Sequence, residues 1–316
     1  MPDPVVKTRL ATLAEVRKPA SEGRLYAILD CCDAPVIYAK VREMDESQAV
    51  CLYRGKLNPD VLAEAPYLVR ATPDLVDWIE KTAWKTPWGI FVVANTDLRS
   101  LRKHFRRFFT VADDKGDAVY FRYYDPRVLS VYLPTCTDEE LRVFLGPVLA
   151  FGVGDPKAAT VTYFLREGAP VAAEQLPRGA ILQIRPMQMK AFSDAAAKRF
   201  EVRMVDHLQA RFPTECTALG DDRLHRLIRK GVDKARYHGF KTEQEICLYI
   251  ELMLLLGDGF DTDATLPWTA LILAEQPEEP KEKIKRLYEA SLEYMRESKR
   301  DKGQNKSSYA DDKRSQ

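Results

Sequence analysis

The chain has 316 residues, of which 46% are hydrophobic and 10% aromatic, enough to bury apolar cores in about two domains. Its 48 lysines and arginines nearly balance its 47 aspartates and glutamates, which excludes a chain-wide attraction to nucleic acid or to an anionic membrane. We find no signal-peptide run at the N-terminus and no segment near the ~20 apolar residues of a membrane span. These features predict a cytoplasmic protein.

Residues 1–185 predict an α/β lobe with a mixed sheet and flanking helices. Strands are expected over 25–30, 49–53 and 88–93, where β-prone apolar residues run together. One helix is expected after Asp33 through Val41, and Thr72 followed by Pro73 predicts the start of another. That second helix would turn four apolar residues inward: Leu75, Val76, Ile79 and Ala83. Because strands and helices alternate, some parallel pairing is expected.

The helix predicted over 98–108 has two chemically different faces. Apolar residues recur at helical spacing, and basic residues fill the remaining positions: Leu98, Leu101, Phe105 and Phe108 against Arg99, Arg102, Lys103, Arg106 and Arg107. We expect the apolar face to enter the core. Arg106 and Arg107 should then present their charge on the surface.

The rest of the lobe is predicted from turn and capping signals. The polar stretch 113–117 between two β-prone segments predicts a hairpin, which residues 125–127 should end. Thr137 and Glu140 form a capping box for a helix that Gly146 stops. Residues 152–154 are interpreted as a plain turn, and 160–165 and 180–184 as strands at the edge of the lobe.

From Pro186 the pattern becomes helical, which predicts a smaller all-α lobe over 186–273. Apolar residues recur three or four positions apart, and Thr242 with Glu245 forms another capping box before a stop at Gly257. Residues 274–316 predict a charged amphipathic helix followed, from Gly303, by a disordered tail. This helix is either a terminal docking helix or a marginal, solvated one.

The sequence lacks the common enzyme signatures: a phosphate loop, a nucleophile elbow and a zinc-protease helix. Its six cysteines include no Cys-x-x-Cys pair and no nearby histidine at metal spacing, so we expect reduced thiols, no metal and no cofactor. Cys51 or Cys136 with His104 would make a nucleophile and base, but a third orienting residue is missing. We therefore expect a protein that is not an enzyme.

Arginines beside aromatic residues and prolines stand out in the first lobe, around Arg54, His104 and residues 122–127. This composition is typical of a binding surface. The alternative is a set of structural ion pairs, in which Arg122 or Arg127 clamps Asp125 or Asp30. Nucleic acid is a third reading of the basic helix, and the neutral chain argues against it.

Six motifs in this lobe also occur in order in a known family. Residues 25–30, 52–55, 65–68, 88–91, 101–108 and 121–129 resemble the N-terminal domain of the type VI secretion effector adaptors, also called effector chaperones. The resemblance spans about residues 25–147. It implies a cytosolic protein that binds a cognate toxic effector and the VgrG spike, and that is neither an enzyme nor part of the exported projectile.

The resemblance also points to particular residues. The family pattern falls on charged, aromatic and turn residues: Asp30, Arg54, Gly55, Tyr67, Trp88, Gly89, His104, Arg106, Arg107, Arg122, Tyr124, Asp125, Pro126 and Arg127. Neither nucleic acid nor a membrane is expected as a partner. Two alternatives stay open: an immunity protein that neutralises a toxin, and a cytosolic hydrolase or transferase with its site around Arg122, Asp125 and His104.

Overall fold

The computed structural model describes residues 6–166, 170–171, 182–274 and 279–312. The chain divides into two compact units, residues 1–195 and 196–316, which we call the α/β unit and the helical unit. An α/β region followed by a helical region confirms the predicted fold class. Among the described residues, no helix has both the length and the apolar character needed to span a membrane.

The α/β unit is built on one seven-stranded sheet. Its strand order is β1 (Val6–Thr12), β9 (Thr160–Arg166), β8 (Val148–Gly154), β5 (Gly89–Ala94), β2 (Leu25–Asp30), β4 (Pro66–Arg70) and β3 (Ala49–Cys51). Every strand pairing in this sheet is antiparallel, so the expected parallel pairing is wrong. Strands β4 and β5 do run in the same direction, but they flank β2 on opposite sides instead of pairing with each other.

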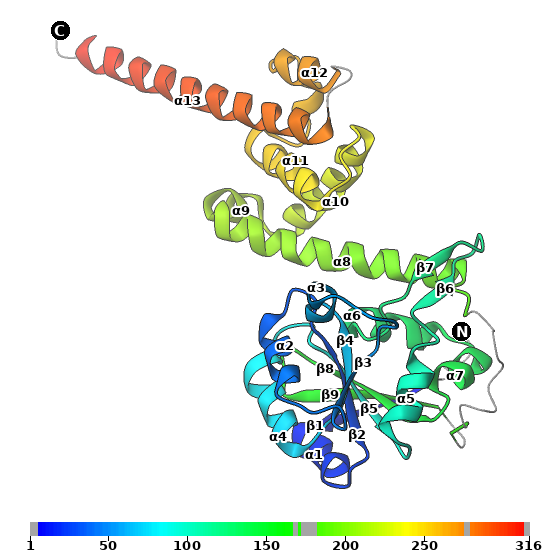
Figure 1. Ribbon diagram of the computed structural model, residues 1–316. Helices are drawn as coiled ribbons and strands as arrows, with labels where there is room; N and C mark the ends of the chain where they lie inside the picture. The colour runs from blue at the N-terminus through cyan, green and yellow to red at the C-terminus, as the bar shows by residue number, and fades with distance from the viewer. Residues whose placement is uncertain (1–5, 167–169, 172–181, 275–278, 313–316) are drawn as a thin grey trace. The chain divides into compact units, whose positions relative to one another are not determined.

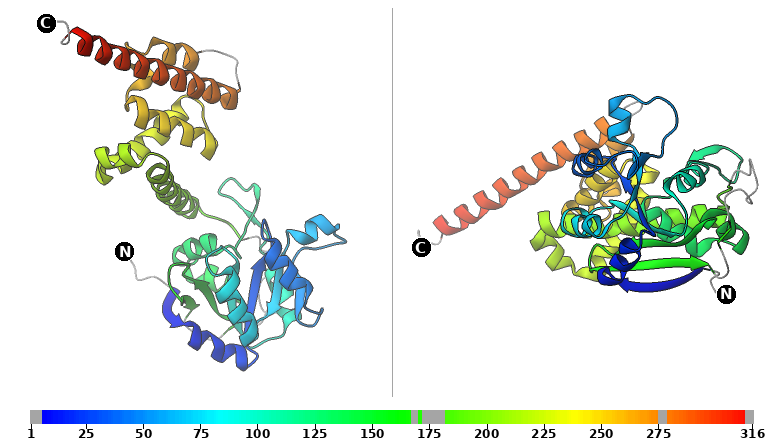
Figure 2. Two further views of the ribbon diagram at one scale, coloured as in Figure 1. Left: turned by 90° about the vertical axis from the view of Figure 1, so that its left-hand side faces the viewer. Right: turned by 60° about the horizontal axis from the view of Figure 1, so that its bottom comes forward.

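Helices cover both faces of this sheet (Figures 1 and 2). One face packs against α5 (Leu98–Phe105), α6 (Pro126–Tyr132) and α7 (Asp138–Leu145). The other packs against α1 (Leu13–Ser21), α2 (Pro35–Arg42) and α4 (Pro73–Trp78), which continues as a π-helical turn, Ile79–Ala83. All six residues of β2 are buried, because alternate side chains enter one core or the other.

Several local predictions in this unit are confirmed. Helix α4 begins after its Thr72 cap, and the four residues expected to face inward are buried. The capping box of Thr137 and Glu140 opens α7, and Gly146 ends it. Strands β6 (Thr110–Ala112) and β7 (Ala118–Tyr120) form the predicted hairpin. These features rest on contacts between residues close in sequence.

Other local predictions are corrected. Gly152 and Gly154 lie inside β8 instead of in a turn; a Cβ on Gly154 would lie 2.9 Å from the Trp84 ring, so the glycine permits close packing. Asp125 does not end a strand but precedes α6 as its N-cap. Residues 180 and 181 of the last predicted strand lie outside the described residues, and Gln183 makes only an isolated bridge with Ala112. The α/β unit also contains the short helix α3 (Pro59–Ala63) and the 3₁₀ turn Leu133–Thr135.

The helical unit starts within α8 (Pro186–Arg211). It continues with α9 (Pro213–Leu219), α10 (Asp221–Tyr237), α11 (Glu243–Leu256), the 3₁₀ turn Phe260–Thr262, α12 (Pro267–Ala274) and α13 (Pro280–Asp312). The capping box of Thr242 and Glu245 opens α11, and Gly257 ends it, as predicted. Helix α13 runs through Gly303 to Asp312, across residues predicted to be a disordered tail.

Candidate partner-binding site

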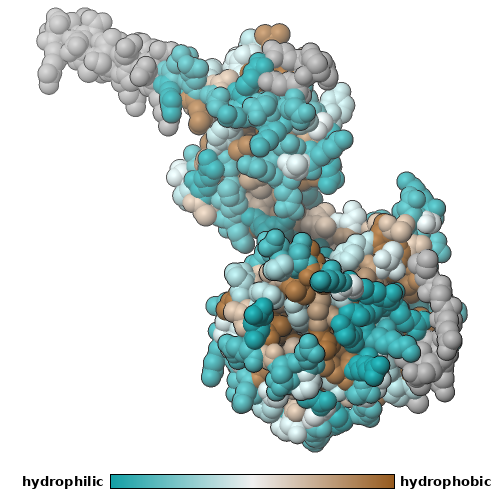
Figure 3. All heavy atoms as spheres, in the orientation of Figure 1, coloured by the Kyte–Doolittle hydropathy of each residue, from teal (hydrophilic) through white to brown (hydrophobic). Residues whose placement is uncertain are grey.

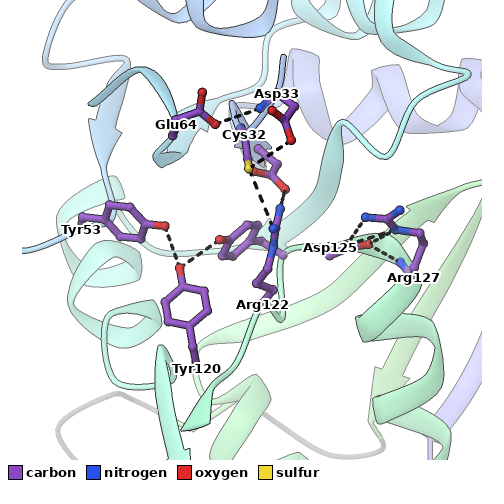
Figure 4. Close-up of polar contacts among 10 residues, drawn as sticks. Cys32, Asp33, Tyr53, Glu64, Tyr120, Arg122, Asp125 and Arg127 are labelled. Carbon is purple, nitrogen blue, oxygen red and sulfur yellow. Dashed lines mark hydrogen bonds and ion pairs between the residues drawn. The ribbon is translucent and has the colours of Figure 1, made fainter. Parts of the chain in front are cut away.

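Polar side chains gather where β2 ends, in a group that we call the arginine–tyrosine cluster (Figure 4). The group comes from the end of β2, the second residue after β3, the end of β7, and the turn into α6 with its first residues. Its members are Asp30, Tyr53, Tyr120, Arg122, Tyr124, Asp125 and Arg127. Five of these seven carry the family pattern.

The first ion pair joins the end of β2 to the turn before α6. Nη2 of Arg122 donates to Oδ2 of Asp30 over 2.6 Å, and the backbone N–H of Cys32 donates to Oδ1 over 3.2 Å. Burial raises the pKa of Asp30, and the bond from Arg122 opposes that rise. The Arg122 guanidinium also lies 5.7 Å from the centre of the Tyr124 ring. Asp30 is buried, yet the Arg122 side chain is 38% exposed.

The second ion pair lies within the first turn of α6. Asp125 accepts the backbone N–H of Arg127 at 2.8 Å, which caps the helix. The Arg127 guanidinium donates to both oxygens of the same carboxylate, from Nε at 2.9 Å and from Nη2 at 2.7 Å. Asp125 is buried, but the Arg127 side chain is 50% exposed. Both ion pairs that the sequence left as an alternative are therefore present, and each leaves part of its arginine open to solvent.

Three tyrosines complete the cluster. The Tyr120 hydroxyl donates to the Tyr53 hydroxyl over 2.9 Å and shares a 3.0 Å hydrogen bond with the Tyr124 hydroxyl. All three rings pack around Phe109, and Tyr120 is 52% exposed. Burial is the main cause that raises the pKa of Tyr120 and of Tyr124, so both stay neutral at physiological pH. The sequence analysis did not select Tyr53 and Tyr120, although Tyr53 lies inside the matching 52–55 motif.

Arg106 has a structural role, which corrects the expectation that it presents its charge on the surface. Its Nε donates to the carbonyl of Leu52 at 2.9 Å, and its Nη2 donates to the carbonyls of Cys51 and Tyr53. Arg106 therefore holds the backbone that leaves β3. Its neighbour Arg107 is half-buried, with its guanidinium 5.9 Å from the centre of the Phe108 ring.

Arg54 is the more accessible of the arginines near β3. Its side chain is exposed, and Nη2 donates to the Arg106 carbonyl at 3.2 Å. Gly55, which follows it, is exposed and has a left-handed backbone conformation with φ of 87°.

Gly89, at the start of β5, is a different case, because a Cβ there would lie 1.9 Å from the Ile28 carbonyl oxygen. Gly89 is thus required by the pairing of β2 with β5.

Three family-pattern residues are buried away from the cluster. His104 is fully buried among aromatic rings and donates from Nε2 to the Phe144 carbonyl over 2.8 Å. Burial lowers the pKa of His104 to about 4, so the ring is neutral. Trp88 stacks on Trp84, and the Tyr67 hydroxyl donates to the Leu62 carbonyl. These residues support the fold.

The two thiols that the sequence offers as nucleophiles, Cys51 and Cys136, do not have the electronic environment of a nucleophile. Burial raises the pKa of Cys136 to about 12, and its Sγ donates to the Tyr132 carbonyl. Burial also raises the pKa of Cys51. A reactive cysteine needs a lowered pKa, and the Nε2 of His104 already donates to a carbonyl. The geometry gives no support to a dyad of either cysteine with His104.

Comparison with known families gives one match in this unit. A family model described as "Domain of unknown function (DUF4123)" matches residues 25–143, from β2 into α7. This domain is known in effector adaptors of type VI secretion systems. The matched range contains the whole arginine–tyrosine cluster. Searches of curated proteins and of solved structures gave no match.

Proposed function

We propose that this protein is a cytosolic, non-catalytic adaptor that binds a cognate toxic effector and promotes its loading onto the VgrG spike of a type VI secretion system. The observation that carries the proposal is the match over residues 25–143 to a domain known in such adaptors. The arginine–tyrosine cluster inside that range offers the chemistry of a binding surface. The effector and the VgrG spike are proposed partners.

The cluster has the composition of a protein-binding hot spot. Tyrosine and arginine are enriched at such sites because each offers a large contact area together with hydrogen-bonding groups. Here the exposed parts belong to Tyr120, Arg122 and Arg127, and buried groups hold each of them in place. A side chain that is already fixed loses little entropy on binding. Figure 3 shows hydrophilic residues over much of the visible face, with smaller hydrophobic areas among them.

A hydrolase or transferase around Arg122, Asp125 and His104 receives less support. Asp125 is occupied by the helix cap and by Arg127, and His104 is buried in the aromatic core. A general base must reach the proton that it removes, and neither residue offers an accessible, unoccupied atom for that task. An immunity protein would bind the catalytic domain of the toxin, whereas an adaptor would bind a non-toxic targeting region.

The experiment is co-purification with the toxin encoded next to this gene. The toxin is produced as two separate parts, its targeting region and its toxic domain. Wild-type protein should capture the targeting region. Tyr120→Ala should weaken that capture because it removes the most exposed ring of the cluster. The control is Tyr237→Ala on α10, which removes a ring that is 88% exposed and lies outside the matched residues 25–143. Tyr237→Ala should melt close to wild type. Tyr120→Ala also removes the bonds to Tyr53 and Tyr124, so capture is measured at a temperature at which both variants are folded.

Two results would overturn the proposal. Capture of the toxic domain instead of the targeting region would indicate an immunity protein. Turnover of an ester, phosphoester or nucleotide that is lost in Asp125→Ala, while Tyr120→Ala stays active, would indicate an enzyme.

A further inference from the structure

A histidine, a cysteine and a glutamate converge in the helical unit. Cys247 and Glu251 lie one turn apart on the same face of α11, and His207 comes from α8. His207 Nε2 lies 2.6 Å from Glu251 Oε1, and Cys247 Sγ lies 3.9 Å from the same oxygen. The three candidate ligand atoms all lie within 4.8 Å of one another.

We propose that His207, Cys247 and Glu251 form a binding site for a divalent transition-metal ion of the Zn²⁺ class. Imidazole nitrogen, thiolate sulfur and carboxylate oxygen are the three ligand types that Zn²⁺ takes in proteins. With bonds of about 2.0 to 2.3 Å, tetrahedral ligands lie about 3 to 4 Å apart. Cys247 Sγ and Glu251 Oε1 already have this spacing, and the His207 and Glu251 atoms, 2.6 Å apart, must separate by about 1 Å when an ion enters. Water would take the fourth position, since the His207 side chain is 40% exposed.

The surroundings of Glu251 fit this role. Its side chain is only 1% exposed, and a carboxylate buried to that extent must be paired or bind a cation. The Tyr288 hydroxyl donates to Oε2 over 2.8 Å, which leaves Oε1 facing the histidine and the thiol. Such an outer hydrogen bond orients a ligating carboxylate.

Arg211 is the competitor for this position. Its Nη1 lies 3.4 Å from Glu251 Oε1, and its Nη2 donates to the Tyr288 hydroxyl at 3.0 Å. The Arg211 side chain is 49% exposed, so it can move into water when an ion arrives. Binding requires two proton movements and one displacement. The His207 ring moves its Nε2 proton to Nδ1 by exchange with solvent, so that Nε2 can bind the ion. The Cys247 thiol releases its proton to solvent and the Arg211 guanidinium moves into water, so the two charges of the divalent ion replace one proton and one guanidinium.

The first test uses Co²⁺ as the probe on the untagged, metal-stripped, full-length protein. A thiolate ligand gives a sulfur-to-cobalt charge-transfer band, so wild-type protein should show this band with saturation at one ion per chain. Zn²⁺ should displace the Co²⁺ and raise the melting temperature, because it binds only the folded chain. Absence of the band, or a melting temperature that Zn²⁺ leaves unchanged, would refute the site.

The second test uses matched variants. Cys247→Ser should abolish the charge-transfer band, and His207→Gln should weaken Co²⁺ binding by at least about tenfold. Cys216→Ser on α9 and His225→Gln on α10 remove the same residue types elsewhere in this unit and should bind Co²⁺ like wild type. Arg211→Met should bind more tightly than wild type, because it removes the competing cation. If these residues form only a network of ion pairs, Arg211→Met should instead lower the melting temperature and should not increase Co²⁺ binding.

Discussion

Asp30 and Asp125 in the α/β unit and Glu251 in the helical unit are buried carboxylates at different kinds of backbone position. In the α/β unit, Asp30 ends a strand and Asp125 precedes a helix, so each accepts a backbone N–H and is paired with one arginine. In the helical unit, Glu251 lies inside α11, where N–H groups are already used by the helix. Its carboxylate is bound by side chains from four residues: His207, Arg211, Cys247 and Tyr288.

The difference shows how local backbone determines what a buried charge requires. At a strand end or a helix N-terminus, free N–H groups supply part of the hydrogen bonding that a buried carboxylate requires. Inside an α-helix such as α11, all of that hydrogen bonding must come from side chains. Asp261, in the 3₁₀ turn Phe260–Thr262, is also bound by side chains, those of Lys234, His238 and Tyr249.

The largest loss of unfolding free energy is expected when a buried carboxylate that is bound only by side chains is removed. Asp261→Ala leaves the buried Tyr249 hydroxyl, 2.9 Å away, without its acceptor and removes the counter-charge of the Lys234 ammonium, 2.6 Å away, which keeps its bond to the Asp258 carbonyl. Breaking a buried pair in this way costs about 3 to 5 kcal/mol of unfolding free energy. Urea denaturation of the full chain measures it. Asp258→Ala is the control, because Asp258 is exposed with Lys230 as its partner and should cost less than about 1 kcal/mol. Equal losses of unfolding free energy in Asp261→Ala and Asp258→Ala would contradict the role given to the buried carboxylate.

Histidines sharpen the same contrast. In the helical unit, His207, His225 and His238 each lie beside a carboxylate, whereas His104 in the α/β unit is bound only to a carbonyl. A cation at the position of His104 would have no counter-charge. We therefore expect acid to destabilise the α/β unit through this residue.

The sign follows from the two pKa values. Burial lowers the pKa of folded His104 to about 4, against about 6.5 in an unfolded chain. As pH falls below about 6.5 the unfolded state binds the proton first, so stability is complete above that pH and falls towards pH 4 by up to about 3 kcal/mol. His104→Gln keeps a donor for the Phe144 carbonyl and removes the titration. Its unfolding free energy should be lower at neutral pH and should vary less across this window, and an unchanged slope would refute the assignment.

Local chemistry explains which parts of this fold could be predicted. The caps at Thr72, Thr137 and Thr242 were visible because each depends on residues three positions apart. Strand order was not, since pairing joins distant segments; β1, for example, pairs with β9. The sequence predicted that helices would separate the strands, but not that β2 would lie between β4 and β5.

The candidate site was predictable only in part, for the same reason. Arg122 and Asp30 are among the ion pairs that the sequence predicts as an alternative, as a clamp between strand ends, although 92 residues separate them. Arg106 was misassigned because its acceptors are backbone carbonyls, which have no signature in sequence. His207 was not associated with Cys247, because a search for short metal spacing does not reach a residue on another helix.

A smaller effect is expected where backbone shares the bonding. Asp125→Ala removes both a helix cap and the partner of Arg127, whose half-exposed guanidinium can return to water. We expect a loss of about 2 to 3 kcal/mol, of which the cap supplies about 1. Asp97→Ala is the matched control, since Asp97 caps α5 by accepting the N–H and the hydroxyl of Ser100 and should cost only the cap. Denaturant midpoints of the two variants give the ion-pair contribution by difference. A loss for Asp125→Ala no larger than that for Asp97→Ala would show that its arginine pair contributes nothing.

The smallest expected loss of stability distinguishes two arginines of the α/β unit, Arg54 and Arg106, both of which the family pattern includes. Arg106 is bound to carbonyls at the end of β3, so Arg106→Ala leaves those part-buried acceptors without a donor and should cost about 1 to 2 kcal/mol. Arg54→Ala removes an exposed side chain with one bond to a carbonyl and should cost less than about 0.5 kcal/mol. Thermal melting ranks the two variants, and effector capture should follow a different order, because an exposed arginine beside Tyr53 can contact a partner directly while Arg106 acts through the backbone. If Arg54→Ala melts as early as Arg106→Ala, the division between surface and structural arginines at this site is wrong.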